Sequence, residues 1–231
     1  MDNNSNKYTF LYASIMVVLV AVALAFTNGI LKEKQSRNIE LDKMAQILRS
    51  VKVIATPDDA DDLYDKIVVT AYLLNNKSEV ISNDARKAFL VDVSKEILKD
   101  VSERRLPVYE AKVEGMKKYI LPVYGAGLWG PIWGYVSFNE DKKTIFAASF
   151  SHQGETPGLG AQISTSEFQQ QFEAKTIFRD SVFTSIAVLK AGQKDESRDA
   201  VDAISGGTIT SKGLEAMLQN SLNAYVAFLT K

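Results

Sequence analysis

The sequence predicts an α+β protein, in which a single N-terminal transmembrane helix precedes a mixed α+β domain with an antiparallel sheet. Three observations support this prediction. No charged residue lies between Lys7 and Lys32. Strand-like runs alternate with short polar turns from Leu106 to His152, and the last segment carries apolar residues at helical spacing. The chain therefore divides into a tail and anchor helix (residues 1–31), a stalk helix (32–56) and one packed domain (57–231).

Composition limits the chemistry that this chain can perform by itself. The 231 residues include 27 basic and 28 acidic side chains, no cysteine and one histidine, His152. The missing cysteine excludes disulfides, zinc–thiolate sites, iron–sulfur clusters and thiol nucleophiles, and one histidine excludes a multi-histidine metal site. A net charge of -1 argues against a nucleic-acid partner. We expect no metal site and no catalytic side chain, so redox chemistry requires a bound organic cofactor.

The anchor is predicted from the apolar run Tyr8–Leu31. About 20 helical residues cross a hydrocarbon core, and a helix satisfies its own backbone hydrogen bonds there. A cleaved signal peptide is the alternative, because Ala23-Leu24-Ala25 fits a cleavage site. The leader is barely basic, however, and the helical pattern continues beyond the span. Lys32, Lys34 and Arg37 follow the span, so the positive-inside rule weakly favours a cytoplasmic domain.

The elements of the domain follow from local patterns. Thr56-Pro57 ends the stalk helix, and Asp58–Asp65 forms an acidic first turn. Ile67–Thr70 begins a strand, and Ser82 or Asn83 caps a helix over residues 84–100. Two strand-like runs flank residues 139–143 and predict a hairpin. Other expected elements are strands over 107–113, 119–124 and 183–189, a short helix capped by Ser166 that pairs Phe168 with Phe172, and a final helix from Ser211 with the stripe Leu214, Leu218, Leu222, Tyr225 and Leu229.

Two glycine-rich stretches are not needed to build a core. Gly154–Gly160 follows a predicted strand, and Asp202–Ser211 opens the final helix. Glycines let backbone N–H groups approach a ligand, and a helix N-terminus favours an anion such as phosphate. The alternative is a plain glycine turn followed by a helix cap, the role expected of Thr210 and Ser211. Neither stretch has the ending of a nucleotide-triphosphate loop.

These stretches carry a resemblance to a known family. The chain resembles the C subunits of the sodium-pumping NADH:quinone reductases and, more distantly, the G subunit of their Rnf relatives. The matching pieces are the N-terminal span, Gly127-Leu128-Trp129-Gly130, Gly134-Tyr135, Gly154–Gly160 and Asp202–Thr208. They occur in the same order along essentially the whole chain.

The resemblance implies a covalent FMN in the α+β domain. In that family a flavin transferase, using FAD and magnesium, joins the FMN phosphate to the threonine of a Ser-Gly-Ala-Thr motif, which corresponds here to Thr208. This chain has Gly207 where alanine is usual. Glu155 and Thr156 are then expected to hydrogen-bond the flavin, with Leu159 and Trp129 against its ring. The remaining expected cofactor-binding residues are Gly158, Gly160, Asp202, Ser205, Gly206 and Gly207.

Two of these residues have structural alternatives. The alternative for Trp129 is a buried anchor of the sheet. The alternative for Glu155 is a surface carboxylate of the loop. His152 is expected to be a polar residue at a strand end, and Trp133 a packing residue.

The resemblance also implies a role and a location. The family protein is one of six subunits of an inner-membrane complex, in which electrons pass from NADH through FMN and iron–sulfur centres to quinone with export of sodium. Its flavin domain is periplasmic, contrary to the weak charge bias. The chain alone has no NADH site and should not oxidise NADH. Two alternatives remain open: an Rnf-type G subunit or other flavinylated electron carrier, and a flavin-free, membrane-tethered binding or sensor domain.

Overall fold

The computed structural model describes residues 6–231, and the chain divides after Lys43 into two compact units. The first unit contains the N-terminal part of helix α1 (Asn6–Arg49). This helix is long and apolar enough to cross a membrane, and its most apolar stretch is exposed. The predicted helix over the apolar run is confirmed. An exposed apolar surface of this extent fits a membrane anchor.

Helix α1 ends at Arg49, whereas the sequence predicts a stalk helix to residue 56. Lys52 adopts the left-handed conformation (φ 63°), and the N–H of Val53 donates to the carbonyl of Leu48 at 3.0 Å. This pattern is a Schellman cap, which closes a helix through its own last carbonyls. The residues of the last turns, including Ile47 and Leu48, are buried in the second unit. Packing and the cap therefore end the helix before Pro57 can act.

A six-stranded sheet forms the centre of the second unit, and every neighbouring pair is antiparallel. The predicted antiparallel sheet and its hairpin are confirmed. The strand order is β2-β1-β3-β4-β5-β6. The strands are β1 (Val68–Leu74), β2 (Val80–Ser82), β3 (Leu106–Val113), β4 (Met116–Ala126), β5 (Pro131–Phe138) and β6 (Ile145–His152).

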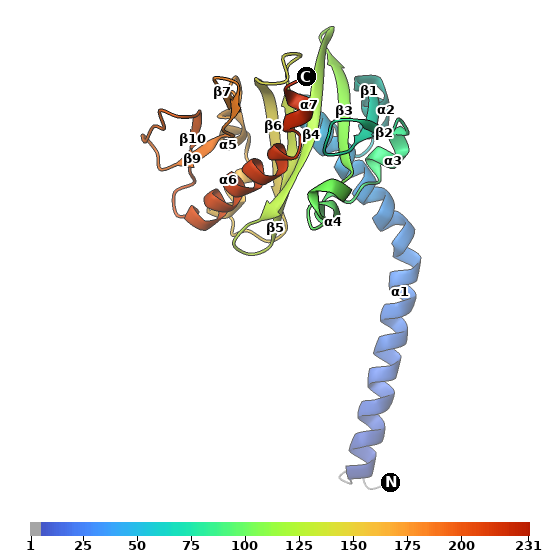
Figure 1. Ribbon diagram of the computed structural model, residues 1–231. Helices are drawn as coiled ribbons and strands as arrows, with labels where there is room; N and C mark the ends of the chain where they lie inside the picture. The colour runs from blue at the N-terminus through green and yellow to red at the C-terminus, as the bar shows by residue number, and fades with distance from the viewer. Residues whose placement is uncertain (1–5) are drawn as a thin grey trace. The chain divides into compact units, whose positions relative to one another are not determined.

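Both faces of the sheet are covered. Figure 1 shows α6 (Thr208–Asn223) lying across one face, where Leu214 and Leu218 pack in the main core cluster with Val136 of β5. On the opposite face of β5, the indole Nε1–H of Trp133 donates to Gln46 Oε1 at 2.9 Å, and the Ser137 hydroxyl donates to the Ser50 carbonyl. The side chains alternate along β5 because successive residues of a strand point to opposite faces.

The short elements differ from the sequence prediction in three places. The helix expected over 84–100 is wrong: α3 (Ala85–Phe89) and α4 (Val93–Glu96) replace it, because Asp84 and Asp92 each accept a backbone N–H and start a separate helix. Helix α5 (Ser166–Gln170) is capped by Thr165, not by Ser166. The strand expected over 183–189 is interrupted where Ser185 has φ 58°, which leaves β8 (Val182–Phe183) and β9 (Ala187–Leu189).

The remaining elements complete the second unit. Helix α6 begins at Thr208, three residues before the predicted start, and ends at Asn223. The predicted single helix is therefore wrong beyond that residue, because Leu229 belongs to a separate short helix with Tyr225 as its N-cap residue, although every residue of the predicted apolar stripe is buried. The rings of Phe168 and Phe172 pack together as expected, with 5.7 Å between their centroids. The other elements are α2 (Ala60–Ile67), η1 (Val101–Glu103), η2 (Gly160–Ser164), β7 (Phe178–Arg179), β10 (Ala200–Asp202) and α7 (Val226–Leu229).

Candidate functional site

Three segments that are distant in sequence meet beside the start of α6. They are the turn between β4 and β5, the glycine-rich loop after β6, and the turn that leads from β10 into α6. Together they enclose a cavity of about 410 Å³. The lining residues are Leu128, Trp129, Glu155, Thr156, Leu159, Gly160, Gly206, Gly207, Thr208, Ile209 and Thr210.

The turn between β4 and β5 presents two large apolar side chains to this cavity. The N–H of Gly127 donates to the carbonyl of Gly130 at 2.8 Å, which closes the turn. Trp129 is 67% exposed and Leu128 is also exposed. The interpretation of Trp129 as a buried anchor of the sheet is therefore wrong. Exposed Leu159 and Ile209 line the same cavity, so its walls suit a flat apolar ring system.

Helix α6 begins with an exposed threonine. Gly207 occupies the N-cap position, no side chain caps the helix, and Thr208 is the first helical residue. The preceding turn needs a glycine at 206, where φ is 73°. The first N–H groups of a helix lack intrahelical partners and the helix dipole is positive there, so this end attracts a phosphate group. The Thr208 hydroxyl thus lies where a phosphate is favoured.

A second cavity of about 430 Å³ adjoins the first and shares Gly206 and Thr208 with it. Two lysines, Lys190 and Lys212, line this second cavity together with Ser205, Gln193 and Ser211. Lys212 also pairs with Glu215 at 2.7 Å. Thr208 therefore stands between an apolar cavity and a cationic one, an arrangement that fits a cofactor with an aromatic ring and a phosphate.

Glu155 is 4% exposed and points inward. Its Oε1 accepts the backbone N–H of Trp129 at 2.9 Å, and its Oε2 accepts the Thr210 hydroxyl at 2.5 Å. Burial raises the pKa of the Glu155 carboxyl, but hydrogen bonds from Thr210, Trp129 and Leu128 outweigh this effect and hold the pKa below its ordinary value. The interpretation of Glu155 as a surface carboxylate is wrong.

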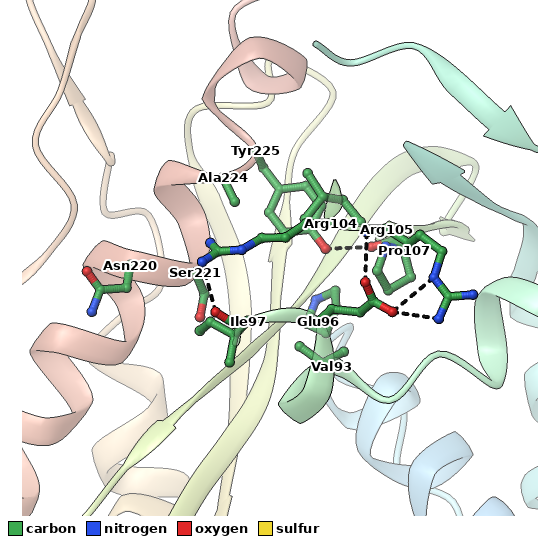
Figure 2. A pocket seen from close by; sticks show the side chains of 12 residues that line it. Val93, Glu96, Ile97, Arg104, Arg105, Pro107, Asn220, Ser221, Ala224 and Tyr225 are labelled. Carbon is green, nitrogen blue, oxygen red and sulfur yellow. Dashed lines mark hydrogen bonds and ion pairs between the residues drawn. The ribbon is translucent and has the colours of Figure 1, made fainter. Parts of the chain in front are cut away.

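A second buried glutamate lies elsewhere in the domain. Figure 2 shows the Glu96 carboxylate facing the Arg105 guanidinium, which donates through Nε at 2.9 Å and Nη2 at 2.6 Å. Lys99 Nζ and the Arg105 backbone N–H also donate to it. The adjacent cavity measures about 30 Å³, which is the size of a water molecule rather than of an organic cofactor. This cluster is therefore a structural clamp.

Comparisons with known proteins agree with this geometry. A family model described as an FMN-binding domain matches residues 127–223, which include all three segments around the cavity. The C subunit of the Na⁺-translocating NADH-quinone reductase from Vibrio alginolyticus is 28% identical over 229 residues, covering 93% of this chain and 89% of that protein. The crystal structure of Shewanella oneidensis NqrC superposes with a TM-score of 0.64 at 25% identity, covering 83% of this chain and 98% of that chain.

The deciding likeness is to the crystal structure of the Na⁺-translocating NADH-quinone reductase C subunit from Parabacteroides distasonis. It is 48% identical, covers 87% of this chain and 98% of that chain, and superposes with a TM-score of 0.81. The chain belongs to this NqrC family. The family resemblance predicted from the sequence and the α+β fold are confirmed.

Within the NqrC fold, most of the predicted site residues come together. Thr208, Gly206, Gly207, Glu155, Thr156, Leu159, Gly160 and Trp129 all line the apolar cavity, and Ser205 lines the cationic one. Gly158 and Asp202 line neither. The Asp202 carboxylate accepts the N–H of Gly192 at 3.3 Å and so holds the turn after β9. Its motif position alone did not reveal this role.

Three residues of the cavity in this NqrC domain were missed by sequence reasoning. Leu128 and Ile209 stand beside predicted residues, and their exposure is the signal that only the structure supplies. Thr210 was expected to cap the helix. It is buried and donates to Glu155, while the Ser211 hydroxyl accepts the N–H of Ile204 at 3.1 Å. The cap interpretation is wrong because α6 begins before both residues.

The turn before Thr208 in this NqrC domain differs from the usual motif of the family at Gly207, and the structure gives a steric context for this difference. A Cβ atom at this position would lie 2.9 Å from Cγ2 of Ile204. An alanine here requires a shift of Ile204, whereas glycine leaves the turn relaxed. The departure from Ser-Gly-Ala-Thr therefore matches the local packing of this chain.

Proposed function

We propose that this chain carries one FMN, joined through its phosphate to the Thr208 hydroxyl, and passes electrons from NADH toward quinone within a Na⁺-translocating NADH-quinone reductase. It is an FMN-carrying subunit of that enzyme by family membership. The covalent bond to Thr208 is proposed in addition to what family membership establishes. The observation that carries it is the exposed Thr208 hydroxyl on the shared rim of the apolar and cationic cavities.

The residues present fit this cofactor. Trp129, Leu128, Leu159 and Ile209 give the ring an apolar enclosure, and Thr156 contributes a hydroxyl to the wall. Lys190 and Lys212 supply positive charge beside Thr208, where the uncapped start of α6 adds its own. When bound, FMN supplies the one- and two-electron redox chemistry. The protein's task is to hold the ring, shield it and set its potential.

The attachment experiment uses the full chain co-expressed with a flavin transferase. The denatured gel band should fluoresce under ultraviolet light, and the intact mass should exceed that of the chain by one FMN phosphoester. Thr208→Ala should abolish both signals. Thr70→Ala, which changes an exposed threonine on β1, is the matched control and should retain them. An unmodified wild-type mass in the presence of the transferase contradicts the proposal.

The partners follow from the same proposal. We place the chain among the six subunits of a membrane assembly, with neighbours that carry FMN and iron–sulfur centres. The relatives named above are NqrC proteins, which favours this assembly over an Rnf-type one. The chain alone should not oxidise NADH. Purified flavinylated chain mixed with NADH should leave the flavin oxidised, and NADH consumption by the isolated chain contradicts this assignment.

We also propose that α1 anchors the chain in the inner membrane with the flavin domain on the periplasmic side. The apolar stretch of α1 supports the anchor, and the family resemblance supports the side. Protease added to spheroplasts should degrade the domain while the cytoplasm stays intact. Mass spectrometry of the mature N-terminus is the companion test, since a chain that starts near Phe26 contradicts a retained anchor.

A further inference from the structure

The Glu155 side chain joins the three segments that build the flavin cavity. It belongs to the glycine-rich loop after β6, and its two oxygens accept from the Trp129 backbone on one side and from Thr210 of α6 on the other. Both oxygens are engaged inside the protein. These bonds give Glu155 a structural role in addition to the hydrogen bond to the flavin that its motif position suggests.

The space around this carboxylate is closed. A Cβ atom at position 127 would lie 2.4 Å from Glu155 Oε1, and one at position 160 would lie 2.3 Å from Oε2. Any side chain at either position would collide with the carboxylate, so the two loops pack on it with bare backbone. The glutamate is thus built into the wall of the cavity, and its position fixes the position of Trp129 and of the first turn of α6.

Glu155 keeps its charge through hydrogen bonds rather than through an ion pair with a lysine or arginine. Its hydrogen-bond donors are neutral, and the groups that lower its pKa are Thr210, Trp129, Leu128 and His152. The Nδ1 atom of His152 accepts the N–H of Glu155 at 3.1 Å, so this hydrogen bond involves the glutamate backbone and not its carboxylate. Within residues 6–231, no lysine or arginine lies within ion-pair distance of Glu155. The wall of the cavity therefore carries the negative charge of this carboxylate.

We propose that Glu155 is the positioning residue of the flavin cavity and that its fixed negative charge lowers the reduction potential of the bound FMN. This inference rests on the proposed function. Reduction adds negative charge to the ring, and a buried anion close by opposes it because screening by water is weak inside the wall. We call Glu155 and its two hydrogen bonds, to the Trp129 backbone and to the Thr210 hydroxyl, the clasp. The clasp also positions Thr208, because Thr210 lies two residues further along the same helical turn.

Two substitutions at the clasp separate charge from position. Glu155→Gln keeps the shape but removes the charge, so the FMN potential should become more positive. Thr210→Val keeps the charge but removes a hydroxyl dipole that partly offsets it, so the potential should become more negative. If Glu155 had a purely structural role, the reduction potentials of both variants would shift in the same direction. Loss of a charge-assisted hydrogen bond in the clasp should also slow flavin attachment by about tenfold in each variant.

The measurement is a spectroelectrochemical titration at pH 8 of the full flavinylated chain, with attachment followed by intact mass. Glu167→Gln, which removes an exposed carboxylate on α5, is the control and should keep wild-type potential and attachment. Opposite shifts in the two clasp variants support the inference. A wild-type potential in flavinylated Glu155→Gln overturns it. If Glu155→Gln takes up no flavin, Thr210→Val decides, and wild-type potential with wild-type attachment there overturns the inference. Failure of the wild-type chain to gain flavin mass instead contradicts the proposed function.

Discussion

The two buried glutamates of the domain are held by different kinds of partner. Glu96 is 3% exposed and receives hydrogen bonds from the guanidinium of Arg105 and the ammonium of Lys99. Glu155 is equally buried but receives only neutral donors, the Trp129 backbone and the Thr210 hydroxyl. Both carboxyls have pKa values below the ordinary range. The two carboxylates are thus equally buried and both ionised, but only the charge of Glu96 is offset by neighbouring cations.

This difference separates a site that stabilises the domain, at Glu96, from a site that serves a cofactor, at Glu155. A carboxylate whose charge is cancelled by cations ties α4 to the start of β3 and changes little beyond that contact (Figure 2). A carboxylate with neutral donors costs more to bury and leaves a field in its surroundings. That field falls on the cavity beside Thr208, where the proposed FMN would bind.

The largest expected effect is a loss of stability at the clamp. Glu96→Gln removes the charge that pairs with Arg105 and Lys99. Those cations are partly exposed and can be solvated, so the loss should be about 2 kcal/mol rather than the full cost of breaking a buried pair. For a domain of this size the melting temperature of the full chain in detergent should fall by about 4–8 °C. Flavin attachment and the reduction potential of the flavin should stay at wild-type values. A shifted potential would contradict the claim that Glu96 has no influence on the cofactor.

Acid should weaken both sites. Each glutamate has a folded pKa below its unfolded value near 4.5. Each therefore contributes stability that is present above the unfolded pKa and is lost as the pH falls through the folded pKa. Unfolding followed from pH 6 downward should show stability falling below about pH 4.5. Glu96→Gln and Glu155→Gln should each flatten this decline, and an unchanged profile in either variant contradicts the assigned ionisation.

A smaller effect is expected at the cationic cavity. Lys190→Gln removes one positive charge beside Thr208 without touching the clasp. Attachment by the transferase should slow by about threefold, the scale of one solvated charge acting on a phosphate. Lys77→Gln, on the turn between β1 and β2, is the matched control. Faster attachment in Lys190→Gln would place the phosphate away from this cavity.

The smallest effect is a response to salt. The cations around Glu96 reach solvent, so about 1 M salt should reduce the destabilisation caused by Glu96→Gln. The donors around Glu155 are neutral and buried, so the destabilisation caused by Glu155→Gln should be insensitive to salt. Melting curves of the two variants at low and high salt measure this contrast. Equal salt dependence would show that the two carboxylates are held in the same way.

Much of the fold could be predicted from the sequence because its signals are local. The apolar run of α1, the β5–β6 hairpin and the buried stripe of α6 each follow from periodicity within one segment. The errors arise where a tertiary contact or a cap competes with the pattern. Lys52 closes α1 early, and Asp84 and Asp92 divide one expected helix into two.

The candidate site was predictable as a set of segments but not as a set of roles. The glycine motifs and the threonine indicate which loops meet. They do not indicate which way Glu155 points, because its inward orientation depends on Gly127 and Thr210, which are distant in sequence. Trp129 and Glu155 illustrate this limit. The exposure of Trp129 and the burial of Glu155 determine their roles, and the motif around each residue indicates neither property.

The most direct test of the central claim is the location of the flavin within the chain. Tryptic digestion of the flavinylated protein should release residues 199–212, which contain Ser205, Thr208, Thr210 and Ser211. Fragmentation by mass spectrometry should place the FMN phosphoester on Thr208, because Thr210 and Ser211 are buried and hydrogen-bonded. Flavin found on Ser205, Thr210 or Ser211, or flavin released from the denatured chain, would contradict the account.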